Sequence, residues 1–158
     1  MKRIFFPLLI VAALAACNSA DKPAEDHAGH NHGQETDKAA EIAKTLQDSA
    51  NYTSIEWIDS TFKDMGKIKK GQKIEVSFPL KNIGNKNLVI SQVDAGCGCT
   101  VPEKPEKPIA PGGQEVIKAV FDSQNQSVGT PLRKTVSVVA NTMPSTTHLL
   151  TFSVTVVE

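Results

Sequence analysis

The sequence predicts an all-β protein: an immunoglobulin-like antiparallel β-sandwich of about seven strands, preceded by a signal peptide and a flexible, partly helical tether. Three observations support this fold class. Apolar and polar residues alternate with a period of two after Tyr52, segments rich in Gly, Asn, Pro and Ser separate the alternating runs, and no strong helical period interrupts them. Alternation of this kind is typical of strands that bury one face in a sandwich.

Two runs carry the clearest alternation. In KIEVSFPLK every second residue from Ile74 to Leu80 is apolar, and in LLTFSVTVV the same holds from Leu150 to Val156. Further strands are expected in SIEWID, NLVISQV, EVIKAVF and TVSVVAN. Proline cannot donate a hydrogen bond to a ladder, so the strand that contains Pro79 is expected to lie at a sheet edge there or to carry a bulge.

Residues 1–16 are expected to be a lipoprotein signal peptide. Basic residues precede the apolar run IFFPLLIVAALA, which is too short to span a bilayer comfortably. The run ends in LAAC, which resembles the bacterial lipobox, where signal peptidase II cuts before a diacylated cysteine. The resemblance implies that Cys17 carries the lipid; cleavage after the A-x-A pattern that ends at Ala15 is the alternative. The expected location is the bacterial cell envelope, as a membrane-anchored lipoprotein of the outer membrane rather than the inner.

Residues 17–52 are expected to tether the folded domain, residues 53–158, to the membrane. The stretch from Asn18 to about Asp37 holds no large apolar residue, so it is predicted to be disordered. The next segment, KAAEIAKTLQDSA, repeats apolar residues at helical spacing and predicts a marginal helix. As a flexible coil, roughly 35 residues reach on the order of 30 Å, so the domain is expected to stand off the membrane.

A histidine-rich tract lies inside the tether. HAGHNHG places His27, His30 and His32 close together, and such tracts bind Cu(II), Ni(II) or Zn(II). The alternative is a polar spacer in which the histidines are incidental. No cofactor is certain; copper or another transition metal is the one that this tract would take. His148, in the last predicted strand, is expected to be a surface residue.

Cys97 and Cys99, in DAGCGCTVP, are the remaining cysteine pair. In an extended strand residues i and i+2 lie about 6.7 Å apart, at the upper limit of the Cα separation that a disulfide accepts. A bond therefore requires a local turn, which Gly96 and Gly98 would permit by adopting positive φ. Three interpretations remain open: a structural pair, bonded or reduced, that closes a turn; a redox-active dithiol; and a Cu(I) site made of two thiolates.

Composition and motifs limit the function classes. Seventeen basic and seventeen acidic side chains cancel, which gives no reason to expect a nucleic-acid partner. The sequence contains neither G-x-S-x-G, nor H-E-x-x-H, nor a glycine-rich phosphate loop, so we expect no enzyme and assign no catalytic residue. We expect a non-enzymatic lipoprotein that acts as a binding or scaffolding module for an unidentified envelope protein. The alternatives are a metal-handling lipoprotein that uses the histidine tract and Cys-Gly-Cys, and a thiol-redox protein.

Most of the predicted domain, from about residue 60 to 157, resembles the bacterial domain of unknown function 1573. The resemblance rests on N-x-G, L-x-I, C-G-C-T-x-P, I-x-P-G and the end of the following strand. The matching residues are Asn82, Gly84, Leu88, Ile90, Cys97 to Thr100, Pro102, Ile109, Pro111, Gly112, Val120 and Phe121. Gly96 departs from the family, in which Ser more often precedes the first cysteine. The resemblance implies an immunoglobulin-like fold related to cilium- and centrosome-associated sandwiches, commonly in exported lipoproteins, and it implies no activity.

Overall fold

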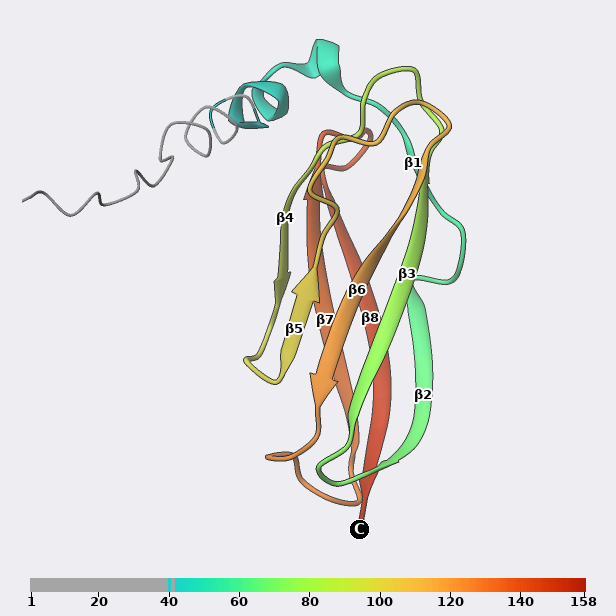
Figure 1. Ribbon diagram of the computed structural model, residues 1–158, viewed down its shortest axis with the longest axis vertical. Coiled ribbons are helices and arrows are strands. Elements are labelled where there is room, and N and C mark those ends of the chain that lie inside the picture. Colours follow the sequence, from blue (N-terminus) through green and yellow to red (C-terminus); the bar gives the residue numbers. More distant parts are fainter. Residues whose placement is uncertain (1–39, 41) are drawn as a thin grey trace, which may run out of the picture. The chain divides into compact units, whose positions relative to one another are not determined.

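The computed structural model describes residues 40 and 42–158, and the chain after Tyr52 forms two packed β-sheets (Figure 1). A 3-10 helix, η1 (Ser49–Asn51), precedes the sheets. The strands of the described part are β1 (Ile55–Trp57), β2 (Phe62–Lys69), β3 (Lys73–Asn82), β4 (Ile90–Ala95), β5 (Thr100–Glu103), β6 (Gln114–Asp122), β7 (Pro131–Ala140) and β8 (Thr147–Val157).

One sheet has the strand order β1-β3-β6-β5 and the other β2-β8-β7-β4. The chain crosses from one sheet to the other at every connection except those from β5 to β6 and from β7 to β8. Neighbouring strands are antiparallel, with one difference from the expectation: β2 runs parallel to β8. The predicted sandwich is confirmed, with eight strands in the described residues instead of about seven.

The core lies between the two sheets, where the alternating faces predicted from the sequence meet. In β3 the side chains of Val76, Phe78 and Leu80 are buried. The inward residues of β8 are Leu150, Phe152, Val154 and Val156, and all four are buried. The rings of Phe121 and Phe152 meet edge to face across the core, with centroids 5.7 Å apart. The register predicted for both strands is therefore correct.

Pro79 lies where β3 changes from an inner strand to an edge strand. β1 pairs with β3 only as far as Leu80. Ile58, the next residue after β1, donates its N–H to the Pro79 carbonyl at 3.0 Å, so the backbone of Pro79 points away from β6. The missing N–H thus removes no bond from the β3–β6 ladder. The predicted edge position is confirmed.

The alternation did not predict β2 and β5. β2 is rich in lysine and changes register between Asp64 and Lys67, where Gly66 has a φ of 65°. A bulge of this kind shifts side chains to the other face, so the period of two is broken. β5 has only four residues, and Pro102 is one of them. Of the predicted helical segment, residues 40 and 42–47 are helical, and the rest of the tether before residue 42 lies outside the described residues.

Two buried asparagines fix the loops at the upper end of the sandwich in Figure 1. The amide of Asn82 donates to the carbonyls of Lys86 and Ile109, at 2.8 Å each. Asn141 accepts from the N–H of Val89 at 2.7 Å and donates to the Asn87 carbonyl at 2.9 Å. Both side chains are fully buried, and their hydrogen bonds replace those that the loop backbone would otherwise make to water. They determine where β4 begins.

Candidate functional site

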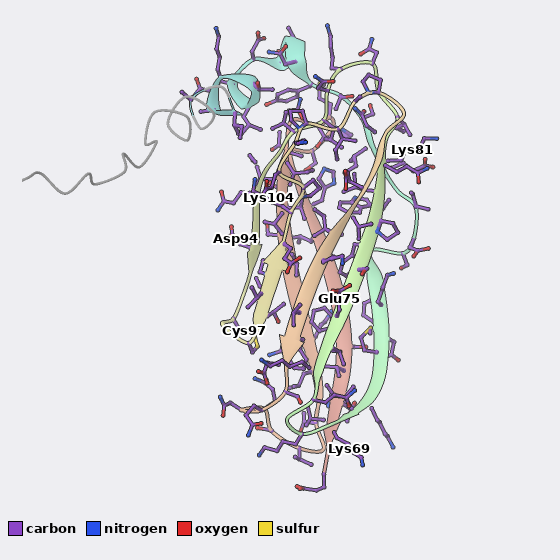
Figure 2. The ribbon with its side chains drawn as sticks, in the orientation of Figure 1. Lys69, Glu75, Lys81, Asp94, Cys97 and Lys104 are labelled. Carbon is purple, nitrogen blue, oxygen red and sulfur yellow. A yellow bond between two sulfur atoms is a disulfide. The ribbon has the colours of Figure 1, made fainter. Side chains whose placement is uncertain are left out.

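Cys97 and Cys99 lie in the turn that carries the chain from β4 to β5, at one side of the sandwich (Figure 2). The two cysteines are joined by a disulfide, with Cα atoms 5.3 Å apart. The N–H of Thr100 donates to the Cys97 carbonyl at 3.2 Å, which closes a β-turn over the two intervening residues. The local turn that a bond was predicted to require is present.

The reason predicted for the glycines of this turn is wrong. The described glycines with positive φ do not include Gly96 or Gly98. A Cβ built on either residue would have no heavy atom within 4 Å, so neither glycine is needed for a close approach. The two glycines leave the disulfide without side chains from these chain neighbours, and both cysteines are half-buried.

A buried hydroxyl group lies against both sulfur atoms. Thr100 is 4% exposed, and its Oγ1 is 3.7 Å from Cys97 Sγ and 3.9 Å from Cys99 Sγ. Within the described residues, the two sulfur atoms are the polar partners of that hydroxyl. A hydroxyl held in this way can donate to either sulfur, and a donor stabilises a thiolate more than a thiol. Thr100 is thus a site residue that sequence reasoning quoted only as part of the family motif.

The surroundings of the two sulfur atoms differ. Cys97 lines a hollow of about 240 Å³ together with Thr100, Arg133 and Lys134. Cys99 packs against the hydrophobic core and lines a second hollow, of about 260 Å³, together with Asp122. Backbone donation from Gln124 lowers the pKa of Asp122, which keeps that carboxyl ionised. Cys97 therefore shares its hollow with the ammonium group of Lys134, and Cys99 shares its hollow with Asp122, which pairs with Lys73 at 3.4 Å.

Lys134 lines the hollow at Cys97, and its hydrogen-bond partner Gln126 lines the hollow at Cys99. The Lys134 side chain is half-buried, its Nζ donates to Gln126 Oε1 at 3.2 Å, and the same Nζ lies 5.5 Å from the centroid of the Phe121 ring. The guanidinium carbon of Arg133 lies 5.3 Å from the Phe62 ring, so its charge is directed to the outer face of the sheet. Sequence reasoning missed Lys134 because it lies on β7, far from the cysteines in the chain, and no local motif marks it.

The edges of β4 and β5 flank this turn, side by side in Figure 1, and they differ in their backbone groups. On β5, the Asp122 N–H donates to the Cys99 carbonyl at 2.9 Å, so alternate residues place Thr100 and Pro102 toward the open side. The Thr100 N–H is already bonded within the turn, and Pro102 has no N–H. β5 consequently presents no free N–H donor to an added strand.

β4 presents its backbone differently. The Gly96 N–H donates to the Thr135 carbonyl at 3.4 Å, so the pairing with β7 uses Gly96, Asp94 and Gln92, and the backbone groups of Val93 and Ala95 point outward. At the start of the strand the outward position is occupied, because Lys104 Nζ donates to the Ile90 carbonyl at 3.3 Å. Within the described residues, β4 is an end strand of its sheet with both outward N–H groups available.

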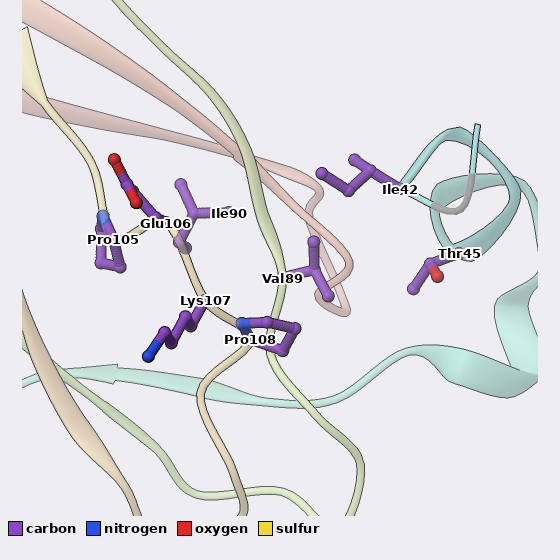
Figure 3. A pocket seen from close by; sticks show the side chains of 8 residues that line it. All are labelled: Ile42, Thr45, Val89, Ile90, Pro105, Glu106, Lys107 and Pro108. Carbon is purple, nitrogen blue, oxygen red and sulfur yellow. The ribbon is translucent and has the colours of Figure 1, made fainter. Parts of the chain in front are cut away.

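An apolar pocket of about 150 Å³ lies at the start of β4 (Figure 3). Val89 and Ile90 form one wall, and the segment from Pro105 to Pro108 forms another. Ile42 and Thr45, from the helical residues before η1, contribute the third wall. The pocket is large enough for one aliphatic side chain, and it adjoins the first residue of β4, Ile90.

Of the other cysteine and the histidines that the sequence analysis singled out, the structure describes only His148. Cys17, His27, His30 and His32 lie outside the described residues. Within residues 40 and 42–158, His, Cys, Asp and Glu form no cluster of three that could hold a metal ion. No helix in that same part of the chain is both long and apolar enough to cross a membrane. His148, expected at the surface, is half-buried: its ring lies 2.8 Å from Thr142 Oγ1 and edge-on to Trp57.

Residues 55–156 match the family described as protein of unknown function (DUF1573), and residues 1–18 match the prokaryotic membrane lipoprotein lipid attachment site. No curated protein matches the chain. The second match identifies a membrane-anchored lipoprotein of the bacterial envelope.

Two solved structures show the same fold. A protein of unknown function from Porphyromonas gingivalis W83 is 18% identical, with a TM-score of 0.60; the match covers 68% of this chain and 49% of that one, so this chain spans about half of that relative's length. The ASH/PapD-like domain 7 of human CEP192 is 11% identical, with a TM-score of 0.55, and the match covers 68% of this chain and 88% of that one. At these identities the likeness shows a PapD-like, immunoglobulin-like sandwich. Since the family match spans most of the chain and includes both sheets, the protein belongs to the DUF1573 family of bacterial proteins.

Proposed function

We propose that this lipoprotein is a non-enzymatic binding module, which takes an extended segment of another envelope protein as an added strand along β4. The observation that carries the proposal is that β4 has an open edge and that an apolar pocket adjoins the start of the same strand. An added strand gains its affinity from main-chain hydrogen bonds and its specificity from pockets for alternate side chains. β4 offers both features.

The neighbouring edge explains why β4 would be the strand that receives the segment. β5 lies beside β4 but has no free N–H donor, since Pro102 lacks one and the Thr100 N–H is used in the turn. On β4 the outward N–H and carbonyl groups of Val93 and Ala95 would bond to the partner's backbone. One aliphatic side chain of the partner would then enter the pocket beside Ile90.

The lipid anchor would set where this happens. We infer that Cys17 is the lipidated residue, because it follows the lipobox-like LAA inside the matched attachment site, and that the anchor lies in the outer membrane. Two acyl chains suffice for stable attachment. The chain between Cys17 and β1 would let the domain search for a partner within about its own width of the membrane.

Site-specific photocrosslinking in cells tests the binding function. A photoreactive amino acid replaces Asp94 on β4 or, as the control, Glu75 on β3; both side chains are exposed on the sandwich (Figure 2). We expect one defined envelope protein to crosslink at position 94 and not at position 75. Adduct formation at both positions alike, or at neither, would refute binding at β4.

A pair of proline substitutions sharpens the same experiment. Val93→Pro removes an outward N–H from β4 without touching the ladder to β7, and it should abolish the crosslink at position 94. Ser77→Pro removes an N–H that points away from β6 on the free part of β3, and it should leave the crosslink intact. Thermal unfolding of both variants shows that the domain has folded.

A further inference from the structure

Lys134 is a half-buried ammonium group that pairs with no carboxylate among the described residues. The ion pairs of that part of the chain are Lys63–Asp59, Lys73–Asp122 and Lys118–Glu75. Lys134 instead donates to a neutral amide, Gln126 Oε1. A charge taken partly out of water usually has a counter-charge. The group that shares its hollow and could supply one is Cys97, whose sulfur becomes an anion when the disulfide is reduced.

We propose that the Cys97–Cys99 disulfide is a thiol–disulfide exchange site that accepts two electrons from a pair of cysteine thiols in another exported protein, and that Cys97 is the sulfur that forms the mixed disulfide. This activity goes beyond strand binding and does not depend on it. The site is partly accessible, because both cysteines are half-buried rather than buried and each lines a surface hollow.

The unequal surroundings of the two sulfur atoms select Cys97. An incoming thiolate is attracted to the hollow where Lys134 lies, because that ammonium pairs with no carboxylate among the described residues, whereas Asp122 in the other hollow is already paired with Lys73. Cys99 also packs against the core, which restricts attack on its sulfur, whereas Cys97 is not among the residues packed there. Reaction at Cys97 therefore puts the mixed disulfide on the sulfur that does not pack against the core, and the second step releases that sulfur as a thiolate in the hollow that Lys134 lines.

The exchange balances in two steps. A partner thiolate attacks Cys97 Sγ, the Cys97–Cys99 bond breaks, and Cys99 leaves as a thiolate that takes up a proton. The partner's second thiolate then attacks the partner sulfur of the mixed disulfide, forming the partner's own disulfide and releasing Cys97 as a thiolate. The partner dithiol has lost two electrons and two protons, and the Cys97–Cys99 pair has gained the electrons. Another protein disulfide would reoxidise the pair by the reverse steps.

Lys134 and Thr100 contribute to the second step, in which Cys97 is released. The ammonium of Lys134 and the hydroxyl of Thr100 both stabilise the departing Cys97 thiolate. Because they stabilise the reduced form, they make the disulfide a stronger oxidant. Thr100 contacts the reacting sulfur atoms directly, whereas Lys134 acts as a positioning residue through the hollow that it shares with Cys97.

A redox titration tests the role of Lys134. The full-length lipidated protein in detergent is equilibrated with reduced and oxidised glutathione, and its free thiols are counted by alkylation and mass spectrometry. We expect Lys134→Gln to lower the equilibrium constant for reduction about tenfold, which corresponds to about 30 mV. The matched control, Arg133→Gln, removes an adjacent charge that is directed at Phe62 and should change the constant by at most about twofold. Equal constants for wild type and Lys134→Gln would overturn the proposal.

Single-cysteine variants test the choice of sulfur. With oxidised glutathione as the probe, Cys99→Ser should form a mixed disulfide at Cys97 at least about tenfold faster than Cys97→Ser forms one at Cys99. Adding Lys134→Gln to Cys99→Ser should remove most of that advantage. Equal rates for the two single variants, or a wild-type disulfide that glutathione does not reduce at any ratio, would show a purely structural bond. Thermal unfolding confirms that each variant has folded.

Discussion

At the scale of single residues, close approach rather than backbone conformation explains the glycine of the N-x-G motif. A Cβ on Gly84 would lie 2.7 Å from the backbone nitrogen of Ser54, closer than atoms can come. We predict that Gly84→Ala lowers the free energy of unfolding by about 1–3 kcal/mol, as for an overpacked site. Gly98→Ala, where a Cβ meets nothing within 4 Å, should change it by less than about 0.5 kcal/mol. Urea unfolding of both variants measures the difference; equal losses would contradict the packing argument.

The half-buried position of His148 makes the stability of the domain depend on pH. A histidine at the surface, as expected from the sequence, would not have this effect. Burial lowers the pKa of His148 below its ordinary value of 6.5, so the unfolded chain binds a proton at a pH where the folded chain does not. The stability that neutral His148 contributes is therefore fully present above pH 6.5, and it is lost as the pH falls through the lowered pKa. The pKa values of Asp64 and Asp122 are also lowered, from 3.8, and these groups titrate in a more acidic range.

Substitution of this histidine tests the assignment. His148→Gln keeps a hydrogen-bonding group near Thr142 but cannot be protonated. We predict that the wild-type melting temperature falls between about pH 7 and pH 5 and that the variant's falls less. Thermal unfolding at a series of pH values measures both slopes. A steeper slope in the variant would show that His148 is not buried in its neutral form.

At the scale of elements, the alternation of β8 fixes which residues hold the sheets together. Phe152 is fully buried against Phe121, whereas Thr151 lies on the other face of the strand. We predict that Phe152→Ala lowers the free energy of unfolding by about 3–5 kcal/mol and that Thr151→Ala changes it by less than about 0.5 kcal/mol. Denaturant unfolding of the two variants measures this, and similar losses would refute the register of the strand.

The sequence predicts the strands that are long and bury one face, because their period of two reports burial directly. It fails for β2, where the bulge at Gly66 shifts the pattern, and for β5, which is too short to show one. At the site, the sequence locates Cys97 and Cys99 but leaves open whether they are bonded. It does not indicate Lys134, since only the pairing of distant strands brings that side chain to the turn.

At the scale of the whole molecule, the lipid anchor confines the sandwich to a membrane surface. We predict that Cys17→Ser yields unlipidated protein, released or retained as a precursor, because signal peptidase II requires the diacylated cysteine. Detergent phase partitioning and mass spectrometry of the intact protein measure the acyl chains. Acylated protein recovered from Cys17→Ser would show that another residue carries the lipid.

The most direct test of the central claim is amide hydrogen exchange at the β4 edge, measured residue by residue with and without the partner identified by crosslinking. In the free protein the outward N–H groups of Val93 and Ala95 have no ladder partner and should exchange faster than those of Asp94 and Gly96, which bond to β7. In the complex we expect Val93 and Ala95 to become protected, while the exchange of the free N–H of Ser77 stays unchanged. A complex in which Val93 and Ala95 still exchange as fast as in the free protein would contradict strand addition at β4.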